Sequence, residues 1–364
     1  MLRTALIGLP STGKTTLFQL MTSQREAPRS GHGKLDANVG IARVPDERLD
    51  RLTAIFNPRK RVPATVELAD IAAGGRTGAQ ALLDVVPFRS ADALVHVVRV
   101  FRDTSIPHPS GAIDPARDAQ AMEDELILAD LAVAERRLDR IERDLKKGRT
   151  AELEKERDVL ATCREMLERG APLRALSLDE ADRKRLRGFQ FLSAKPLLVV
   201  INLDESDLGL LSDASAAATR TGLAAFLSRA ATRAVPVCAK IELEIAELPS
   251  EDAAAFLADL GLREPGVDRV IRATYKLLGY VSFFTVGEDE CRAWSIPRGT
   301  EAQEAAGEVH TDMARGFIRA EVVRYEHLVV RGSLAACREH GEMRLEGKQY
   351  VVQDGDVINF RFAT

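Results

Sequence analysis

An octapeptide near the start of the chain limits the possible folds more than any other stretch. It is a G-x-x-x-x-G-K-[ST] motif that runs Gly8, Leu9, Pro10, Ser11, Thr12, Gly13, Lys14 and Thr15. A short apolar run, residues 4–7, precedes the motif, and Thr16 begins a stretch with helix-like composition. In this strand-loop-helix setting, the glycines let successive backbone N–H groups point inward and surround phosphate groups. The motif therefore predicts a nucleoside triphosphate site in a P-loop NTPase fold.

Two side chains of the motif have roles that follow from their positions. Lys14 can reach between the β- and γ-phosphates, so we expect it to act in catalysis. The Thr15 hydroxyl can ligate Mg²⁺, and a carboxylate at the end of a strand usually completes such a metal site. Asp70 ends the β-rich run 65–70. We therefore predict that Thr15 and Asp70 hold Mg²⁺; the alternative for Asp70 is an acidic cap at a strand end.

Length and composition limit the classes of partner. With 364 residues the chain is long enough for two or three domains. The net charge of −4 gives no general attraction to nucleic acid, so we expect no DNA partner, and RNA contact would need a local basic patch. The four cysteines contain no C-x-x-C pair, and no apolar run approaches the length of a membrane span. We expect a cytoplasmic protein with no membrane partner.

Strand candidates alternate with helical stretches over much of the chain. The candidates cover residues 4–7, 65–70, 93–100, 196–202 and 235–239. Apolar strands separated by helices are typical of βαβ units. The pattern predicts an α/β fold with a doubly wound, mostly parallel sheet.

A charged helical stretch interrupts this alternation between residues 119 and 192. Its apolar residues form a heptad seam that comprises Ile127, Leu131, Ala134, Leu138, Ile141 and Leu145. Residues 147–149 break the seam, and it resumes from Leu153 to Leu167. We predict an antiparallel helical hairpin inserted between sheet strands, followed by a third helix that starts with a capping box, residues 177–180. Its charges are interpreted either as a partner surface or as a solvated face.

The pattern changes again from residue 281. Alternating apolar segments, residues 282–286, 292–296 and 349–352, precede a final Asp354-Gly355 turn signal. This alternation predicts a small α+β domain. The expected domain bounds are therefore 1–118 with 193–280 for the nucleotide-binding domain, 119–192 for the helical insertion and 281–364 for the C-terminal domain.

The residues after a buried strand near the middle of the chain bear on the choice of base. GTP-specific proteins usually present Asn-Lys-x-Asp there, whereas this chain has Asn202, Leu203, Asp204 and Glu205. An amide both donates and accepts hydrogen bonds, which suits the N6 and N7 edge of adenine. We therefore expect adenine in preference to guanine. A turn of polar residues that ends the strand is the alternative.

Together these residues resemble one family, the Obg-like ATPases, also called YchF, among the translation-factor-related P-loop NTPases. The resemblance covers nearly the whole chain and rests on the octapeptide and on residues 44–49, 70–72, 96–99, 202–205, 265–273, 306–320 and 346–362. It implies a G domain, the helical (coiled-coil) insertion, a C-terminal TGS domain with a β-grasp fold, ATP as substrate and ribosome or RNA association. It also implies that Asn202 and Leu203 contact the adenine and that Cys238 and Ala239 close its other side.

The chain departs from the family pattern where hydrolysis is controlled. Ser11 stands where the family has Asn, and Lys34 stands at the place of a Thr that would meet Mg²⁺. Ala73 replaces the Gly of the second switch motif, which places the γ-phosphate-sensing N–H at Gly74 or removes it. His108 matches a family histidine proposed to help catalysis, and an imidazole can orient or deprotonate water. An exposed loop histidine is the alternative.

Several functions fit these observations. The first is a slow ATPase that acts as a translation-associated switch. The second is a nucleotide-gated adaptor for ribosome or RNA with little or no hydrolysis, and a GTP-preferring GTPase is a further alternative. Basic residues of the C-terminal domain would contact RNA if they share one face; they are Arg315, Arg319, Arg324, Arg331, Arg338, Arg344, Lys348 and Arg361.

Overall fold

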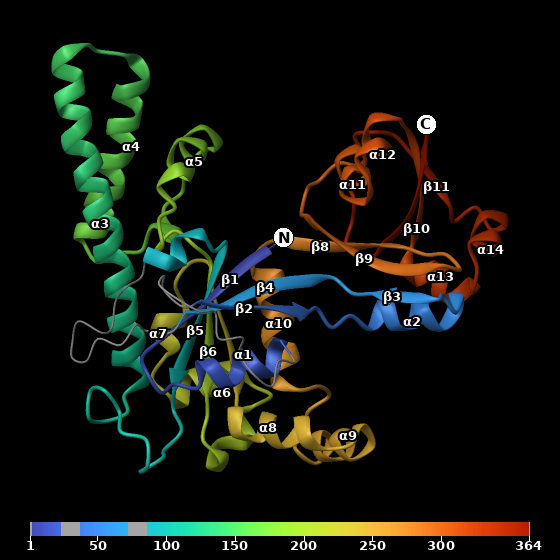
Figure 1. Cartoon of the computed structure of the whole chain (residues 1–364), viewed down its shortest axis with the longest axis horizontal. Coiled ribbons are helices and arrows are strands. Elements are labelled where there is room, and N and C mark those ends of the chain that lie inside the picture. Colours follow the sequence, from blue (N-terminus) through green and yellow to red (C-terminus); the bar gives the residue numbers. More distant parts are fainter. Residues whose placement is uncertain (1, 23–36, 72–85, 364) are drawn as a thin grey trace. The chain divides into compact units, whose positions relative to one another are not determined.

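The computed structural model describes residues 2–22, 37–71 and 86–363. The chain divides into two compact units, which are described separately below. The first unit comprises Met1–Ile41 and Glu67–Leu277, and the second comprises Ala42–Val66 and Leu278–Thr364. Figure 1 labels elements of both where there is room.

The first unit is built on a sheet whose described strands follow the order β2-β4-β1-β5-β6-β7. Their bounds are β1 (Leu2–Ile7), β2 (Ala37–Arg43), β4 (Thr65–Ile71), β5 (Ala93–Arg99), β6 (Leu197–Asn202) and β7 (Thr232–Val237). The pairs β1/β5, β5/β6 and β6/β7 are parallel. The predicted α/β fold with a doubly wound, mostly parallel sheet is therefore confirmed. Its register aligns Arg99 with Asn202 and Asn202 with Val237, so these strand ends lie at one edge of the sheet.

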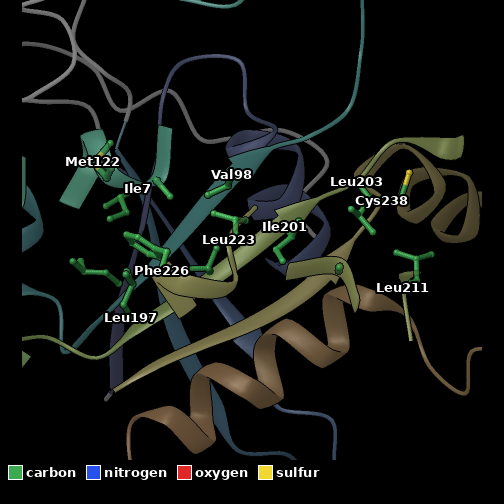
Figure 2. Packing of buried hydrophobic residues seen from close by; sticks show 14 of the residues in the cluster. Ile7, Val98, Met122, Leu197, Ile201, Leu203, Leu211, Leu223, Phe226 and Cys238 are labelled. Carbon is green, nitrogen blue, oxygen red and sulfur yellow. The ribbon is translucent and has the colours of Figure 1, made fainter. Parts of the chain in front are cut away.

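Helices cover this sheet. They are α1 (Lys14–Thr22), α6 (Ala214–Arg220), α7 (Ala224–Leu227), α8 (Ala239–Glu247), α9 (Ser250–Asp259) and α10 (Gly266–Leu277), with 3₁₀ turns η2 (Val86–Ser90) and η5 (Glu205–Leu210). Alternate side chains of the strands, such as Ile7 and Ile201, share one buried cluster with Met122 and Phe226 from helices (Figure 2). Leu203 and Cys238 belong to the same cluster, so the hydrophobic core extends directly to the carboxyl ends of the strands.

The helical segment forms the predicted hairpin. It comprises α3 (Pro115–Lys147), α4 (Ala151–Glu168), α5 (Glu180–Leu186) and the 3₁₀ turns η3 (Leu173–Ala175) and η4 (Arg187–Phe189), and Figure 1 shows α3 and α4 side by side. The predicted seam residues from both helices pack in one cluster. Two details differ from expectation. Helix α3 begins four residues before 119, with Asp114 as its cap, and α5 is capped by Asp179 instead of Ser177.

The second unit has its own sheet, in the order β11-β10-β12-β8-β9-β3. Its strands are β3 (Lys60–Val62), β8 (Tyr280–Thr285), β9 (Glu290–Pro297), β10 (Phe317–Arg324), β11 (Arg344–Glu346) and β12 (Asp356–Phe362). Its helices are α2 (Glu47–Phe56), α11 (Ala302–Val309), α12 (Thr311–Arg315), α13 (Tyr325–Arg331) and α14 (Leu334–Glu339). The expected strand at 349–352 is wrong, because this stretch contributes only an isolated bridge between Glu301 and Val351.

The expected boundary between the two large domains is also incomplete, since residues 42–66 group with the C-terminal part of the chain. Strand β3 pairs in parallel with β9 and extends its sheet. Asp46 caps α2, and Arg48 donates from Nη1 to Asp354 Oδ2 at 3.0 Å while its guanidinium lies 5.1 Å from the centre of the Phe284 ring. Residues 42–66 are held in this unit by contacts with residues distant in the sequence, and local sequence patterns do not show such contacts.

In the part of the chain that the structure describes, every helix is too short or too polar to cross a membrane.

Candidate nucleotide-binding site

The octapeptide forms a loop whose shape depends on backbone that bulky residues rarely adopt. Gly8, Ser11 and Gly13 have φ angles of 141°, 60° and 95°. A Cβ on Gly8 would lie 2.5 Å from the carbonyl oxygen of Val97, and a Cβ on Gly13 would lie 2.5 Å from Nδ2 of Asn202. Both glycines of the motif are thus required by conformation and by close approach. The loop can direct its N–H groups toward an anion, as the motif predicts.

Lys14 lies over this loop. Its Nζ donates to the carbonyl oxygens of Gly8 at 3.0 Å and Leu9 at 2.7 Å. Burial lowers the pKa of Lys14 from 10.5 to about 8, and the nearby Asp70 partly opposes this shift. An ammonium with so little hydration gains strongly from a phosphate group, which would replace the two carbonyl contacts.

His96 lies beneath the loop on β5 and is almost fully buried. Its Cδ2 atom would be 3.5 Å from a Cβ on Gly8. Burial, together with the charges of Lys14 and Arg174, lowers the pKa of His96 to about 3. This imidazole therefore stays neutral at physiological pH and serves as packing under the phosphate loop.

Thr15 and Asp70 lie together, as the sequence predicts. The Thr15 hydroxyl donates to Asp70 Oδ2 at 2.9 Å, and the Asp70 side chain is buried at the end of β4. Mg²⁺ takes oxygen ligands, keeps several waters and uses few protein groups, so one hydroxyl and one carboxylate fit it. Among the described residues no group of three or more His, Cys, Asp or Glu could hold a metal ion, so the site would need oxygens from the nucleotide.

A cavity of about 320 Å³ opens next to the loop. Gly13 and Thr16 line it on the loop side, Asn202, Leu203 and Glu205 line it from the end of β6, and Cys238 and Ala239 line it from the end of β7. The fold therefore brings these predicted base-binding residues to one place. Burial raises the pKa of the Cys238 thiol, so the thiol stays protonated beside this cavity.

Asn202 is less available to a base than the sequence suggested. Its Nδ2 donates to the carbonyl oxygen of Thr12 at 2.9 Å, and its Oδ1 accepts from the N–H of Ala239 at 3.0 Å. The buried amide thus connects the phosphate loop to the start of α8. One N–H and one lone pair of the amide remain for a base.

Comparison with known proteins agrees with this geometry. The family model YchF-GTPase_C, described as a protein of unknown function, matches residues 280–363. The ribosome-binding ATPase YchF of Bacillus subtilis (strain 168) is 41% identical over 369 residues, and the alignment covers 99% of both chains. The protein of the same name from Escherichia coli O157:H7 is 39% identical over 368 residues, with 98% of both chains covered. The chain belongs to the YchF family.

A solved structure supports the same assignment. The Schizosaccharomyces pombe YchF GTPase matches with a TM-score of 0.83 at 27% identity, over 99% of this chain and 97% of that chain. The predicted resemblance to the Obg-like (YchF) family is therefore confirmed, and so is the fold with its helical insertion and C-terminal domain. The relatives carry different names, ATPase in bacteria and GTPase in yeast, so the base preference of this YchF chain must be argued from its own cavity.

His108, the second predicted catalytic residue, is buried, so the exposed alternative is wrong. Its Nδ1 accepts from the N–H of Ser110 at 3.2 Å, and its Nε2 lies 2.9 Å from Asp118 Oδ2. Nδ1 is thus engaged, whereas Nε2 lies beside the carboxylate without a hydrogen bond to any described residue, and the catalytic role of His108 remains a prediction. Lys34, Ala73 and Gly74, where this chain departs from the YchF pattern, lie outside the described residues.

Sequence reasoning missed several contributors to the cavity. Phe101, Lys240 and Leu243 line it, and Leu243 is exposed there. Arg99, fully buried, donates to the carbonyl oxygens of Phe101, Asp103 and Ile106 and lies 4.4 Å from the centre of the Phe101 ring. It thereby fixes the wall that carries Phe101. An arginine that ends a buried strand was the available signal, because a buried guanidinium needs several acceptors.

Proposed function

We propose that this YchF-family chain is an ATP-preferring P-loop NTPase that hydrolyses ATP slowly to ADP and phosphate and acts as a ribosome-associated switch. The observation that carries the proposal is the continuity of the phosphate loop with the adjacent cavity. Gly13 belongs to both, and Asn202 bonds the loop and lines the cavity. The loop could therefore hold the triphosphate while the cavity holds the base of the same nucleotide.

The phosphates would be held by the loop N–H groups and by Lys14, whose weak hydration in the free protein favours a charged partner. Thr15 and Asp70 would hold Mg²⁺, which when bound neutralises charge on the β- and γ-phosphates. The chain's own contribution is thus positioning and electrostatic stabilisation. Slow turnover is expected because the candidate water-orienting residue, His108, already contacts Ser110 and Asp118.

The ribosome-associated role rests on the bacterial relatives, which are named ribosome-binding ATPases. RNA contact through the C-terminal TGS unit and the helical hairpin is the finer proposal. Within the C-terminal unit, Arg319 and Arg361 are cross-strand partners on β10 and β12. Arg338 and Arg361 are also ion-paired to Glu321, at 3.6 and 3.1 Å, which reduces the charge available to RNA. Binding should weaken as salt rises if this face contacts RNA.

The test is a calorimetric titration with ATP, a non-hydrolysable ATP analogue and GTP, each with Mg²⁺, next to a phosphate-release assay on the same samples. The proposal expects tighter binding of ATP than of GTP and slow release that Lys14→Ala abolishes. Tight ATP binding without release would instead favour the nucleotide-gated adaptor. Tighter binding of GTP would contradict the proposed base preference.

A further inference from the structure

An ion pair crosses the mouth of the base cavity. Lys240, in the first turn of α8, places its Nζ 2.6 Å from Oε2 of Glu205, the first residue of η5. Both residues line the cavity, and both side chains are partly exposed. The pair therefore lies where a bound base would meet solvent, whereas the amide of Asn202, which also lines the cavity, is buried.

Three carboxylates line the cavity, those of Asp103, Asp204 and Glu205. Lys240 pairs with Glu205, and the two aspartates accept hydrogen bonds from other residues. Asp204 accepts from the N–H of Arg102 at 2.8 Å and from Ser206 N at 3.1 Å, so it serves as the cap of η5. Asp103 accepts from the N–H of Ser105 at 2.9 Å and from its hydroxyl. Of the three carboxylates, Glu205 is thus the one held by an exposed lysine side chain rather than by backbone N–H groups.

The two purines differ in what they offer to a carboxylate. Guanine presents an N1–H and a 2-amino group, both donors, whereas adenine presents N1 as an acceptor. A free carboxylate accepts two hydrogen bonds from guanine and repels the adenine lone pair. A carboxylate already bound to an ammonium is a weaker acceptor, and the ammonium keeps N–H groups that can donate to adenine.

We infer that Lys240 is a specificity-determining residue: by pairing with Glu205 it keeps that carboxylate from guanine and favours adenine in the cavity. The inference rests on the proposed function, because it assigns the base preference of the same site to a named pair. Specificity of this kind is a difference between two affinities and here includes a repulsive element against the wrong base. Because the pair is partly exposed, its effect is modest and weakens with salt.

The experiment measures the dissociation constants of ATP and GTP for the full chain and five variants. They are Lys240→Met, Lys240→Arg, Glu205→Gln, the double variant Lys240→Met with Glu205→Gln, and Glu244→Gln. Glu244 is an exposed acidic residue one turn along α8 from Lys240, outside the cavity lining, so it is the matched control for charge. Thermal melting of each variant checks folding, which an exposed lysine should not affect.

In Lys240→Met the ratio of ATP to GTP affinity should shift toward GTP by about fivefold, the size expected for an exposed ion pair. Lys240→Arg and Glu244→Gln should leave the ratio as in the wild type. With Glu205→Gln already present, Lys240→Met should produce no further shift, because the carboxylate it masks is gone.

Two results would overturn the inference. An unchanged ratio in Lys240→Met would show that the lysine does not discriminate. If Lys240→Met shifted the affinity ratio equally in the presence of Glu205 and of Glu205→Gln, the lysine would not act through Glu205. Failure of the proposed function looks different: the wild type itself would then bind neither nucleotide or bind GTP more tightly than ATP, and the inference would fall with it.

Discussion

The phosphate loop and the base cavity lie next to each other but are built in different ways. The loop is one short stretch whose shape depends on backbone, with Gly8 and Gly13 in conformations and contacts that exclude a side chain. Apart from Gly13 and Thr16 beside the loop, the cavity is assembled from residues of three distant segments, 101–103, 202–205 and 238–243, and depends on their side chains. A backbone-built site tolerates little change, whereas a side-chain-built site can be adjusted one residue at a time. We therefore expect substitution of the loop glycines to weaken binding of every nucleotide strongly, and substitution of cavity side chains to alter the preference between nucleotides.

The largest effect on nucleotide affinity should follow from Gly13→Ala. The φ of 95° disfavours alanine, and the added Cβ would lie 2.5 Å from Asn202 Nδ2. We expect unfolding free energy to fall by about 1–3 kcal/mol. ATP affinity should fall roughly a hundredfold, the equivalent of about two charge-assisted hydrogen bonds. Denaturant titration and calorimetry would measure both. Gly148→Ala is the control, because its φ is −174° and no atom lies within 4 Å of an added Cβ; equal losses in the two variants would contradict the distinction.

The next largest effect is expected at the residue that belongs to both regions. Asn202→Ala leaves the buried Thr12 carbonyl and Ala239 N–H without their partner. Each such group costs about 1–3 kcal/mol, so stability and ATP affinity should fall together. In Asn359→Ala, an exposed amide loses a single bond to Glu321, and little change is expected. If Asn202→Ala kept full stability and lost only adenine preference, the amide would act as a base reader alone.

Lys14 should make both the stability of the protein and its ATP affinity depend on pH, and this dependence comes from the loop and not from the cavity. Its pKa in the folded protein is about 8, against 10.5 as the ordinary value, so between these pH values the unfolded chain binds more protons. The contribution of Lys14 to the unfolding free energy of the nucleotide-free protein should accordingly rise with pH across that window. Phosphate favours the charged lysine, so ATP affinity should fall above pH 8, by up to about tenfold per pH unit. Calorimetry in buffers of different ionisation enthalpy would detect the proton taken up, and Lys14→Arg should remove the dependence.

The same contrast explains which parts of the site could be found in the sequence. The motif identified the loop, Lys14 and Thr15, because backbone geometry imposes fixed residue types at fixed spacing. Asp70 followed from its place at a strand end, and the fold class followed from alternating strands and helices. These are local signals, and each can be recognised without knowledge of the tertiary structure.

The missed features depend on contacts between distant residues. Lys240 and Glu205 meet although 35 positions separate them, and Arg99 is recognisable only once it is seen to hold the carbonyl oxygens around Phe101. Residues 42–66 join the C-terminal unit through strand β3, through Arg48 and through packing of α2 against β9 and α13, and no sequence periodicity indicates these contacts. For His108 the sequence left a catalytic residue and an exposed loop histidine as alternatives, and it did not show that the imidazole is buried beside Asp118 of α3.

The smallest effect should arise at Ser11, where the loop stores strain that its glycines avoid. Its φ of 60° lies in the left-handed region, which costs a non-glycine residue about 1 kcal/mol and which Asn tolerates better than Ser. Ser11→Asn should therefore raise the unfolding free energy by about 0.5 kcal/mol and strengthen ATP binding about twofold by holding the loop in its binding shape. Ala231 has a φ of 48° outside the loop, so Ala231→Asn should stabilise the protein similarly without changing affinity. A gain in affinity from Ala231→Asn as well would mean that global stability, and not the shape of the loop, limits nucleotide binding.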